Sequence, residues 1–214
     1  MSAICISYSP MLKRAAFIPP SNPILRSEPP SGEGWLHEIK FDGYRAQLHK
    51  DGDVIAIYSK NGKDFTARFR GIAKAVALLP AKRVIIDAEI VASDPQGRPD
   101  FRALHSGAKE GLCAWCFDLM ALNDRNVAAL PLAARRGPLA KLLKSAAAQE
   151  LRFSDSFDDA LALLRQAAVL GLEGIVSKRA DQPYVSGTNR SWVKVKTHDW
   201  REATKDRGEL FKKR

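Results

Sequence analysis

The amino-acid sequence predicts an α+β fold in which antiparallel β-sheets are flanked by helices. Alternating apolar and polar residues run up to the pair Asp42-Gly43 and resume after it, and a second turn follows at 50–53. An Asp-Gly pair between two alternating runs is a strong signal for a β-hairpin. Consecutive hairpins favour antiparallel sheets over a series of βαβ units. Later stretches with helical spacing supply the flanking helices.

Strands are expected where apolar residues alternate or form short runs bounded by turn residues. The expected strands cover residues 34–40, 44–49, 54–58, 83–93, a stretch from 112, 172–178 and 192–197. Cys113 and Cys116 fall in the strand from 112, where we expect them to be core thiols rather than metal ligands, because residues three apart on a strand point to opposite faces.

Three stretches have helical spacing. Residues 65–79 carry apolar side chains at helical intervals and stop at Pro80, and residues 131–149 are helical with a break or new start expected at Gly137-Pro138. Ser156 and Asp159 resemble a capping box that begins a helix through residue 170. The segment 101–105 is expected to be a loop.

Composition and charge bound the class of protein. The 214 residues are 45% hydrophobic and 27% charged, as in a globular domain, and the net charge of +10 suits a polyanionic partner. No apolar run approaches the roughly 20 residues of a membrane span. The 3 cysteines form no disulfide framework, so we expect a reducing, cytoplasmic location and no membrane partner.

The chain divides into three parts. Residues 1–33 are rich in proline and form an extended leader, residues 34–196 form the main domain, and residues 197–214 form a basic tail. We expect the leader to lie over another part of the protein or to be partly disordered.

One lysine lies where a strand meets a turn. Lys40 follows an alternating run, with Asp42 two residues beyond it and Arg45 five residues beyond it. A lysine amine becomes a nucleophile once desolvation or neighbouring cations remove its proton. The alternative is an ordinary hairpin with a solvated lysine. The lysine turn alone does not distinguish this from a nucleophilic lysine.

Charged residues also interrupt strands that are otherwise apolar. Asp87 and Glu89 lie on one face of a strand, as do Lys194 and Lys196, and Glu173 begins another apolar run. Buried without partners, such charges cost several kcal/mol each. A shared cleft with carboxylates for Mg²⁺ and lysines for phosphate oxygens would suit a metal–triphosphate. Glycine-rich phosphate loops are absent from the sequence.

Six segments in order extend this interpretation. They are Lys40-Phe-Asp-Gly-Tyr-Arg45, Ser59-Lys-Asn-Gly62, Asp87-Ala-Glu89, Phe117-Asp118, Glu173-Gly-Ile-Val-Ser-Lys178 and Trp192-Val-Lys-Val-Lys196. Together they resemble the adenylation (nucleotidyltransferase) domain of ATP-dependent DNA ligases of the bacterial end-joining repair type, here without the OB-fold domain. Lys60 stands where this family usually has arginine, and Ala88 where it usually has glycine.

The resemblance implies a ligase-type, ATP-grasp-like nucleotidyltransferase fold with ATP and Mg²⁺ or Mn²⁺ as cofactors. Lys40 would attack the α-phosphate of ATP and carry AMP. The residues implied to contact ATP or AMP are Glu38, Lys40, Arg45, Lys60, Glu89, Phe117, Lys178, Lys194 and Lys196. Those implied to bind metal are Glu89 and Glu173. Among them, Glu38 and Phe117 would recognise and stack on adenine.

By the same resemblance, the partner is nicked double-stranded DNA in DNA repair and recombination. We expect self-adenylation to be weak without an OB-fold domain, and an accessory chain to supply that domain or an end-binding function. Two alternatives stay open: an RNA ligase or capping-type guanylyltransferase, and a non-catalytic DNA-binding or partner-docking remnant.

Overall fold

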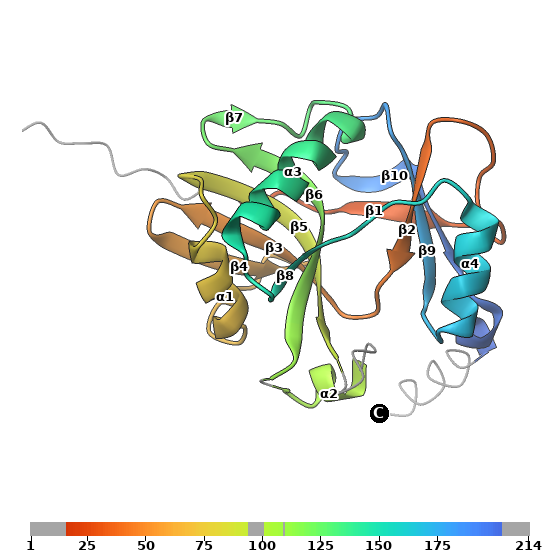
Figure 1. The fold of residues 1–214 in the computed structure, drawn as a ribbon, viewed down its shortest axis with the longest axis horizontal. Helices are drawn as coiled ribbons and strands as arrows, with labels where there is room; N and C mark the ends of the chain where they lie inside the picture. Colours follow the sequence, from red (N-terminus) through yellow and green to blue (C-terminus); the bar gives the residue numbers. More distant parts are fainter. Residues whose placement is uncertain (1–15, 94–100, 109, 203–214) are drawn as a thin grey trace, which may run out of the picture.

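Two β-sheets with helices packed against them make up the fold (Figure 1). A computed structural model of the chain describes residues 16–93, 101–108 and 110–202. The first sheet has four strands in the order β1-β10-β9-β2, and the second has six, with the path β4-β3-β5-β6-β7 and β8 beside β6. The predicted α+β class with mainly antiparallel sheets is confirmed.

The four-stranded sheet consists of β1 (Ser21–Leu25), β2 (Trp35–Lys40), β9 (Gly174–Arg179) and β10 (Gly187–Lys196). The six-stranded sheet consists of β3 (Tyr44–Asp51), β4 (Val54–Ser59), β5 (Arg83–Ala92), β6 (Leu112–Leu122), β7 (Arg125–Asn126) and β8 (Leu151–Phe153). Strand pairs are antiparallel except β1 with β10 and β6 with β8. The hairpin predicted at Asp42-Gly43 is wrong: β2 pairs with β9 in one sheet and β3 pairs with β4 and β5 in the other, so the lysine turn joins the two sheets.

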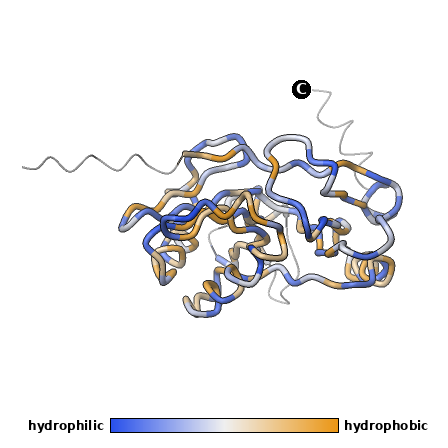
Figure 2. Tube along the Cα trace, turned by 90° about the horizontal axis from the view of Figure 1, so that it is seen from above, coloured by the Kyte–Doolittle hydropathy of each residue, from blue (hydrophilic) through white to orange (hydrophobic). Residues whose placement is uncertain are grey.

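The helices are α1 (Arg70–Ala77), α2 (Phe101–His105), α3 (Leu132–Ala146) and α4 (Ala160–Val169). Helices α1 and α3 pack against the six-stranded sheet, and α4 packs against β9 and β2 of the other sheet. Figure 2 shows the hydrophobic segments within the strands and on the helices. An apolar cluster that contains Ile85, Met120, Tyr184 and Trp192 joins the two sheets. None of the helices in the described ranges is long and apolar enough to span a membrane.

One predicted helix boundary and one predicted loop are wrong. Helix α1 begins at Arg70 rather than at 65, because Phe65 N–H donates to Ile57 O at 2.7 Å and Thr66 Oγ1 accepts from Ile57 N–H at 2.9 Å. These bonds tie the preceding segment to β4 instead of to a helix. The expected loop at 101–105 is the short helix α2.

The other helices differ from expectation at single residues. Helix α3 continues through Pro138, where the sequence predicts a break. Buried leucines at 132, 139, 142 and 143 lie along its length, so packing outweighs the lost backbone hydrogen bond. In α4 the N-cap is Asp159, whose Oδ1 accepts from Ala162 N–H at 2.9 Å, and not Ser156.

The predicted leader contributes to the sheet. Strand β1 lies within residues 1–33 and pairs with β10, so the sheet extends into the range that the sequence assigns to the leader. Residues 1–15 of the leader and 203–214 of the basic tail lie outside the described residues.

Two glycines of the quoted segments occupy positions that no side chain fits. A Cβ at Gly43 would overlap Ile90 O, and a Cβ at Gly174 would overlap Val195 O, with φ of +154° at Gly174. Both contacts are with backbone, which cannot move aside as a flexible side chain can. Glycine therefore permits the close approach of the strands around Lys40 and Glu173.

We predict that Gly43→Ala and Gly174→Ala each lower the free energy of unfolding by about 1–3 kcal/mol, because overpacking forces the backbone apart. Gly137→Ala in α3 is the matched control: nothing lies within 4 Å of its Cβ position, and alanine should stabilise the helix by about 0.5–1 kcal/mol. Denaturant titration of the three variants measures these changes. Equal effects at all three positions would contradict the packing argument.

Candidate active site

A cavity of about 540 Å³ is lined by residues of both sheets. Lys40 and Glu38 reach it from β2, and Arg45 and Glu89 reach it from β3 and β5. The predicted site residues that line it are Glu38, Lys40, Arg45, Lys60, Glu89, Phe117, Lys178, Lys194. The other two, Glu173 and Lys196, are connected to it through Lys40.

The Lys40 amine is held by a carboxylate from the neighbouring strand. Lys40 Nζ donates to Glu173 Oε2 at 2.6 Å, and Lys196 Nζ lies 3.0 Å from Glu173 Oε1. The register explains this arrangement, since Gly174 is the β-partner of both Lys40 and Lys196. Glu173 is buried, whereas the Lys40 side chain keeps 22% of its surface exposed. Lys40, the candidate nucleophile, is therefore bound to Glu173 and still accessible from the cavity.

Glu38 is the centre of a buried polar cluster. Its carboxylate accepts from Arg136 Nη1 at 2.7 Å, from Lys178 Nζ at 2.9 Å to each oxygen, and from Ser154 Oγ at 3.0 Å. Lys178 Nζ also lies 4.4 Å from the ring centroids of Phe117 and Trp192. The predicted base-recognition residues Glu38 and Phe117 thus both contact the ammonium group of Lys178.

Arg45 is held rigidly at the wall of the cavity. Its Nε and Nη2 donate to the two oxygens of Asp87 at 3.1 and 2.7 Å, and its Nη1 donates to Ser21 O at 2.6 Å. Tyr184 Oη donates to the same Asp87 at 2.6 Å. A bidentate, charge-assisted pair fixes the plane of the guanidinium. Ser21 ties β1 to this network, so the leader strand helps to position Arg45.

Burial and nearby charges shift several pKa values. Burial raises the pKa of Glu89 to about 7, an effect that Lys40 and Arg45 partly oppose. The pKa of Lys194 is lowered by burial and then by the charge of Lys40. Burial also lowers the pKa of Lys178, against the opposing effect of Glu38. Titratable groups with perturbed pKa values in a cavity are typical of functional sites.

The sequence did not single out several residues of the site. Arg136 and Ser154 bind Glu38, Tyr184 binds Asp87, and Lys63 lines the cavity. A signal for Arg136 existed, because it lies four residues after buried Leu132 and three before buried Leu139, on the apolar side of α3. A charged residue on that side must find a buried partner.

The carboxylates are compatible with a magnesium site completed by substrate. Among the residues that the structure describes, no three His, Cys, Asp or Glu side chains form a cluster that could hold a metal ion. Mg²⁺ usually takes one or two carboxylates together with phosphate oxygens and water. Glu89 and Glu173 both lie near Lys40, and this donor set fits such a site.

Two sheets that share a cavity with a paired lysine, carboxylates and further lysines define a nucleotidyltransferase-type domain. Comparison with solved structures agrees. A mycobacterial DNA ligase D complexed with ATP matches with a TM-score of 0.73 and 27% identity, covering 84% of this chain and 60% of that one. The ligase domain of M. tuberculosis LigD matches with a TM-score of 0.72 and 26% identity, with the same coverage of both chains.

The family model for the ATP dependent DNA ligase domain matches residues 24–196. The chain belongs to this family. A multifunctional non-homologous end joining protein LigD from Pseudomonas aeruginosa is 36% identical over 185 residues, and a probable DNA ligase from Streptomyces avermitilis is 33% identical over 175 residues. These matches cover 84% and 74% of this chain but 22% and 34% of the two relatives.

We predict that the pH dependence of stability reflects Glu89. The folded protein keeps a proton on Glu89 up to about pH 7, whereas the unfolded chain loses it near 4.5. The native state therefore binds more protons in this window, and stability falls as pH rises through it. The free energy of unfolding of the wild type, minus that of Glu89→Gln, should decrease between pH 4.5 and 7 and level off above.

Metal-free buffer is required for this measurement, because a bound cation would itself favour the ionised carboxylate. A difference that is flat across the window, or that rises with pH, would contradict the assignment of the raised pKa to Glu89.

Proposed function

We propose that this chain is the adenylation domain of an ATP-dependent DNA ligase, in which Lys40 carries AMP and nicks with a 5′-phosphate and a 3′-hydroxyl are sealed. The observation that carries the proposal is the Lys40 amine, which reaches the cavity while bound to Glu173 at 2.6 Å. Membership of the ligase family supports ATP as the nucleotide.

In the first step, ATP is the substrate. Lys40 Nζ gives up a proton to water and attacks the α-phosphorus. A P–N bond forms, the bond from the α-phosphorus to the oxygen that bridges to the β-phosphate breaks, pyrophosphate leaves, and the nitrogen gives a second proton to water. The ammonium form has no lone pair, so Lys40 must leave its salt bridge with Glu173 and give up a proton before attack. Lys196 remains bound to Glu173 at 3.0 Å, which keeps that carboxylate in place when Lys40 departs.

The other lysines of the site neutralise phosphate charge. Lys60 and Lys194 line the cavity, and Lys196 lies beside Glu173. Phosphoryl transfer depends mainly on positioning and charge neutralisation rather than on acid–base chemistry. Glu89 and Glu173 would hold Mg²⁺ or Mn²⁺, which supplies further neutralisation of the phosphate oxygens when bound.

The opposite end of the cavity suits the nucleoside. Phe117 offers an aromatic ring and Glu38 a carboxylate acceptor, while the guanidinium carbon of Arg45 lies 5.3 Å from the centroid of the Phe117 ring. An aromatic face and a carboxylate suit a base that carries an amino group. We assign adenine to this end and the ribose to Arg45 and Glu89.

The second step transfers AMP from Lys40 to the 5′-phosphate of a nick, and the third joins that phosphate to the 3′-hydroxyl with release of AMP. Nicked double-stranded DNA is the proposed partner, and the net charge of +10 favours it. We also propose an accessory chain that supplies an OB-fold domain or end binding, and a cytoplasmic location, with which the free, buried Cys113 and Cys116 agree.

Intact mass after incubation with ATP and Mg²⁺ or Mn²⁺ tests the first step. We expect one AMP adduct, substoichiometric, that hydroxylamine or acid releases as a phosphoramidate would. Lys40→Ala should abolish the adduct, because no other described amine is bound to Glu173 and lines the cavity. Lys141→Ala, on the exposed side of α3, is the matched control and should label like the wild type. Equal labelling of Lys40→Ala would remove Lys40 from its role.

Sealing of a pre-adenylated nick tests the later steps and separates the alternatives. We expect the wild type to join such a nick without ATP, and Glu173→Gln to slow joining by at least about tenfold, since a lost charged hydrogen bond costs about 1.5–3 kcal/mol. Protein that binds nicked duplex but never joins it, even with an added OB-fold domain, would favour the non-catalytic remnant. Adduct formation with GTP in preference to ATP would favour a guanylyltransferase.

A further inference from the structure

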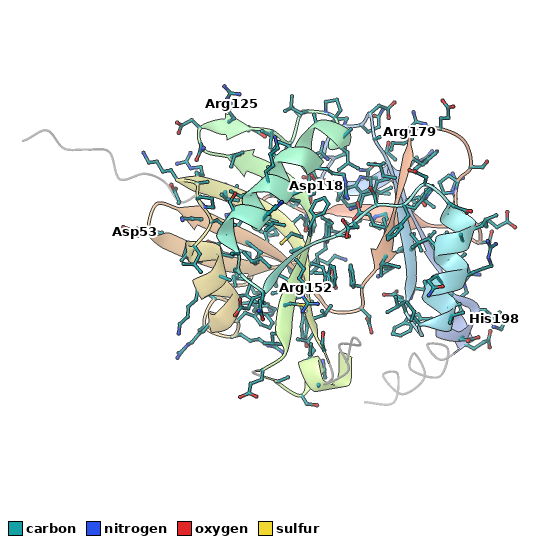
Figure 3. The ribbon with its side chains drawn as sticks, viewed as in Figure 1. Asp53, Asp118, Arg125, Arg152, Arg179 and His198 are labelled. Carbon is teal, nitrogen blue, oxygen red and sulfur yellow. The ribbon has the colours of Figure 1, made fainter. Side chains whose placement is uncertain are left out.

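Two adjacent arginines of α3 bind carboxylates in different sheets. Arg135 Nε and Nη2 donate to Asp118 of β6 at 2.7 and 2.8 Å, and Arg136 Nη1 donates to Glu38 of β2 at 2.7 Å. Both arginines are buried, and Asp118 lies in the interior near α3 (Figure 3). Only one of the two carboxylates, Glu38, lines the cavity. Arg135 is thus a control for Arg136: both stabilise the fold, but only Arg136 binds a carboxylate that lines the cavity.

Arg136 is itself fixed from three directions. Its Nη2 donates to Ser154 O at 2.7 Å, its guanidinium carbon lies 4.7 Å from the centroid of the Phe153 ring, and its Nη1 binds Glu38. The Ser154 hydroxyl donates to the other oxygen of Glu38. Neither Arg136 nor Ser154 lines the cavity, whereas Lys178 does. The donors of Glu38 therefore divide into two outside the cavity and one that faces it.

These donors fill the capacity of the carboxylate. Four hydrogen bonds reach Glu38, and a carboxylate offers about four lone-pair positions. A base amino group can bind Glu38 only if a donor withdraws. Lys178 is the donor that can do so, because it faces the cavity and burial lowers its pKa, whereas Arg136 is anchored to Ser154 and Phe153.

Arg136, the charged partner that remains, then determines how Glu38 binds the base. With Arg136 in place, a buried carboxylate that has lost Lys178 still has a charged partner that holds its position. An ionised carboxylate only accepts hydrogen bonds, so it favours a 6-amino purine over a 6-oxo purine. Without Arg136, only the Ser154 hydroxyl would still hold the carboxylate, which could then turn away from the base amino group.

We propose that Arg136 is a positioning residue for nucleotide selection, which holds the Glu38 carboxylate in place as an acceptor while the base amino group replaces the ammonium of Lys178. This inference rests on the proposed function, because it takes a purine nucleoside triphosphate as the ligand of the cavity. Arg136 itself does not touch the nucleotide.

The test compares binding of ATP and of inosine triphosphate, which carries a 6-oxo group, by calorimetry on the whole chain. The measured ratio is the dissociation constant of inosine triphosphate divided by that of ATP. This ratio should fall by about tenfold or more in Arg136→Gln and by less in Arg136→Lys, as expected for loss of a charged hydrogen bond. In the matched variants Arg135→Gln and Arg135→Lys the ratio should stay at the wild-type value. A purely structural role would weaken both nucleotides equally and leave the ratio unchanged.

A double variant shows whether Arg136 acts through Glu38. In a Glu38→Gln background, Arg136→Gln should change the ratio no further, because the carboxylate that it positions is already absent. If Arg136→Gln fails to fold, Ser154→Ala provides the milder test: it removes one donor to Glu38 and should lower the ratio in the same direction by a smaller factor.

Unchanged ratios in the Arg136 variants, or in Ser154→Ala where the former do not fold, would overturn the inference. So would equal changes in the Arg135 and Arg136 variants. If the wild type forms the AMP adduct but the ratio is the same in the Arg136 variants, this inference is wrong and the proposed function stands. If the wild type neither forms the adduct nor binds ATP, both the proposed function and this inference are wrong.

Discussion

The pairing of buried charges is the constraint on which the arrangement of the two sheets depends. Removing an ionised side chain from water costs several kcal/mol unless a partner meets it with good geometry. Here the partners come from different elements: Asp118 of β6 binds Arg135 of α3, and Glu38 of β2 binds Arg136 of the same helix. Since β6 and β2 belong to different sheets, helix α3 connects them through two consecutive residues.

The same constraint applies at the cavity. Asp87 binds Arg45 and Tyr184, and Arg45 in turn binds the backbone of Ser21 in β1. One buried carboxylate thereby fixes three parts of the chain that are far apart in sequence. Breaking such a network by removing one partner leaves a buried charge uncompensated, which is more costly than never having had the pair. The orientation of the cavity wall thus follows from electrostatics as much as from apolar packing.

Much of the fold could be predicted because its signals are local. Alternation and the turn residues at 50–53 identified the β3–β4 hairpin. The hairpin expected at Asp42-Gly43 was wrong, because β2 and β3 find their partners in different sheets. Charges in otherwise apolar strands identified Glu89 and Glu173. The motif order then indicated that these residues share a site, and Glu89 lines the cavity while Glu173 binds Lys40. The sequence alone could predict these positions because the alternation of a strand determines which of its faces a side chain lies on.

The remaining features depend on contacts between distant segments. Pro138 is tolerated within α3 because buried leucines and the anchored arginines hold the helix on both sides of it, and no local rule counts those contacts. The partners of Glu38 were missed for the same reason. The sequence marks Glu38 by its place two residues before Lys40, but nothing near it in the chain indicates an arginine 98 residues away.

Accessibility separates the ion pairs that hold the fold from those that can exchange with a ligand. The Arg135–Asp118 pair is fully buried, with 0% of either side chain exposed, whereas Lys40 and Lys196 around Glu173 keep 22% and 26%. Salt bridges at a partly open site cost less to break, because water or phosphate can take over the charge. Lys178 is an intermediate case: only 3% of its side chain is exposed, yet it lines the cavity. Its exchange therefore requires a ligand that replaces its contacts to Glu38, Phe117 and Trp192, and a purine base, with an aromatic face and an amino group, offers both kinds of contact.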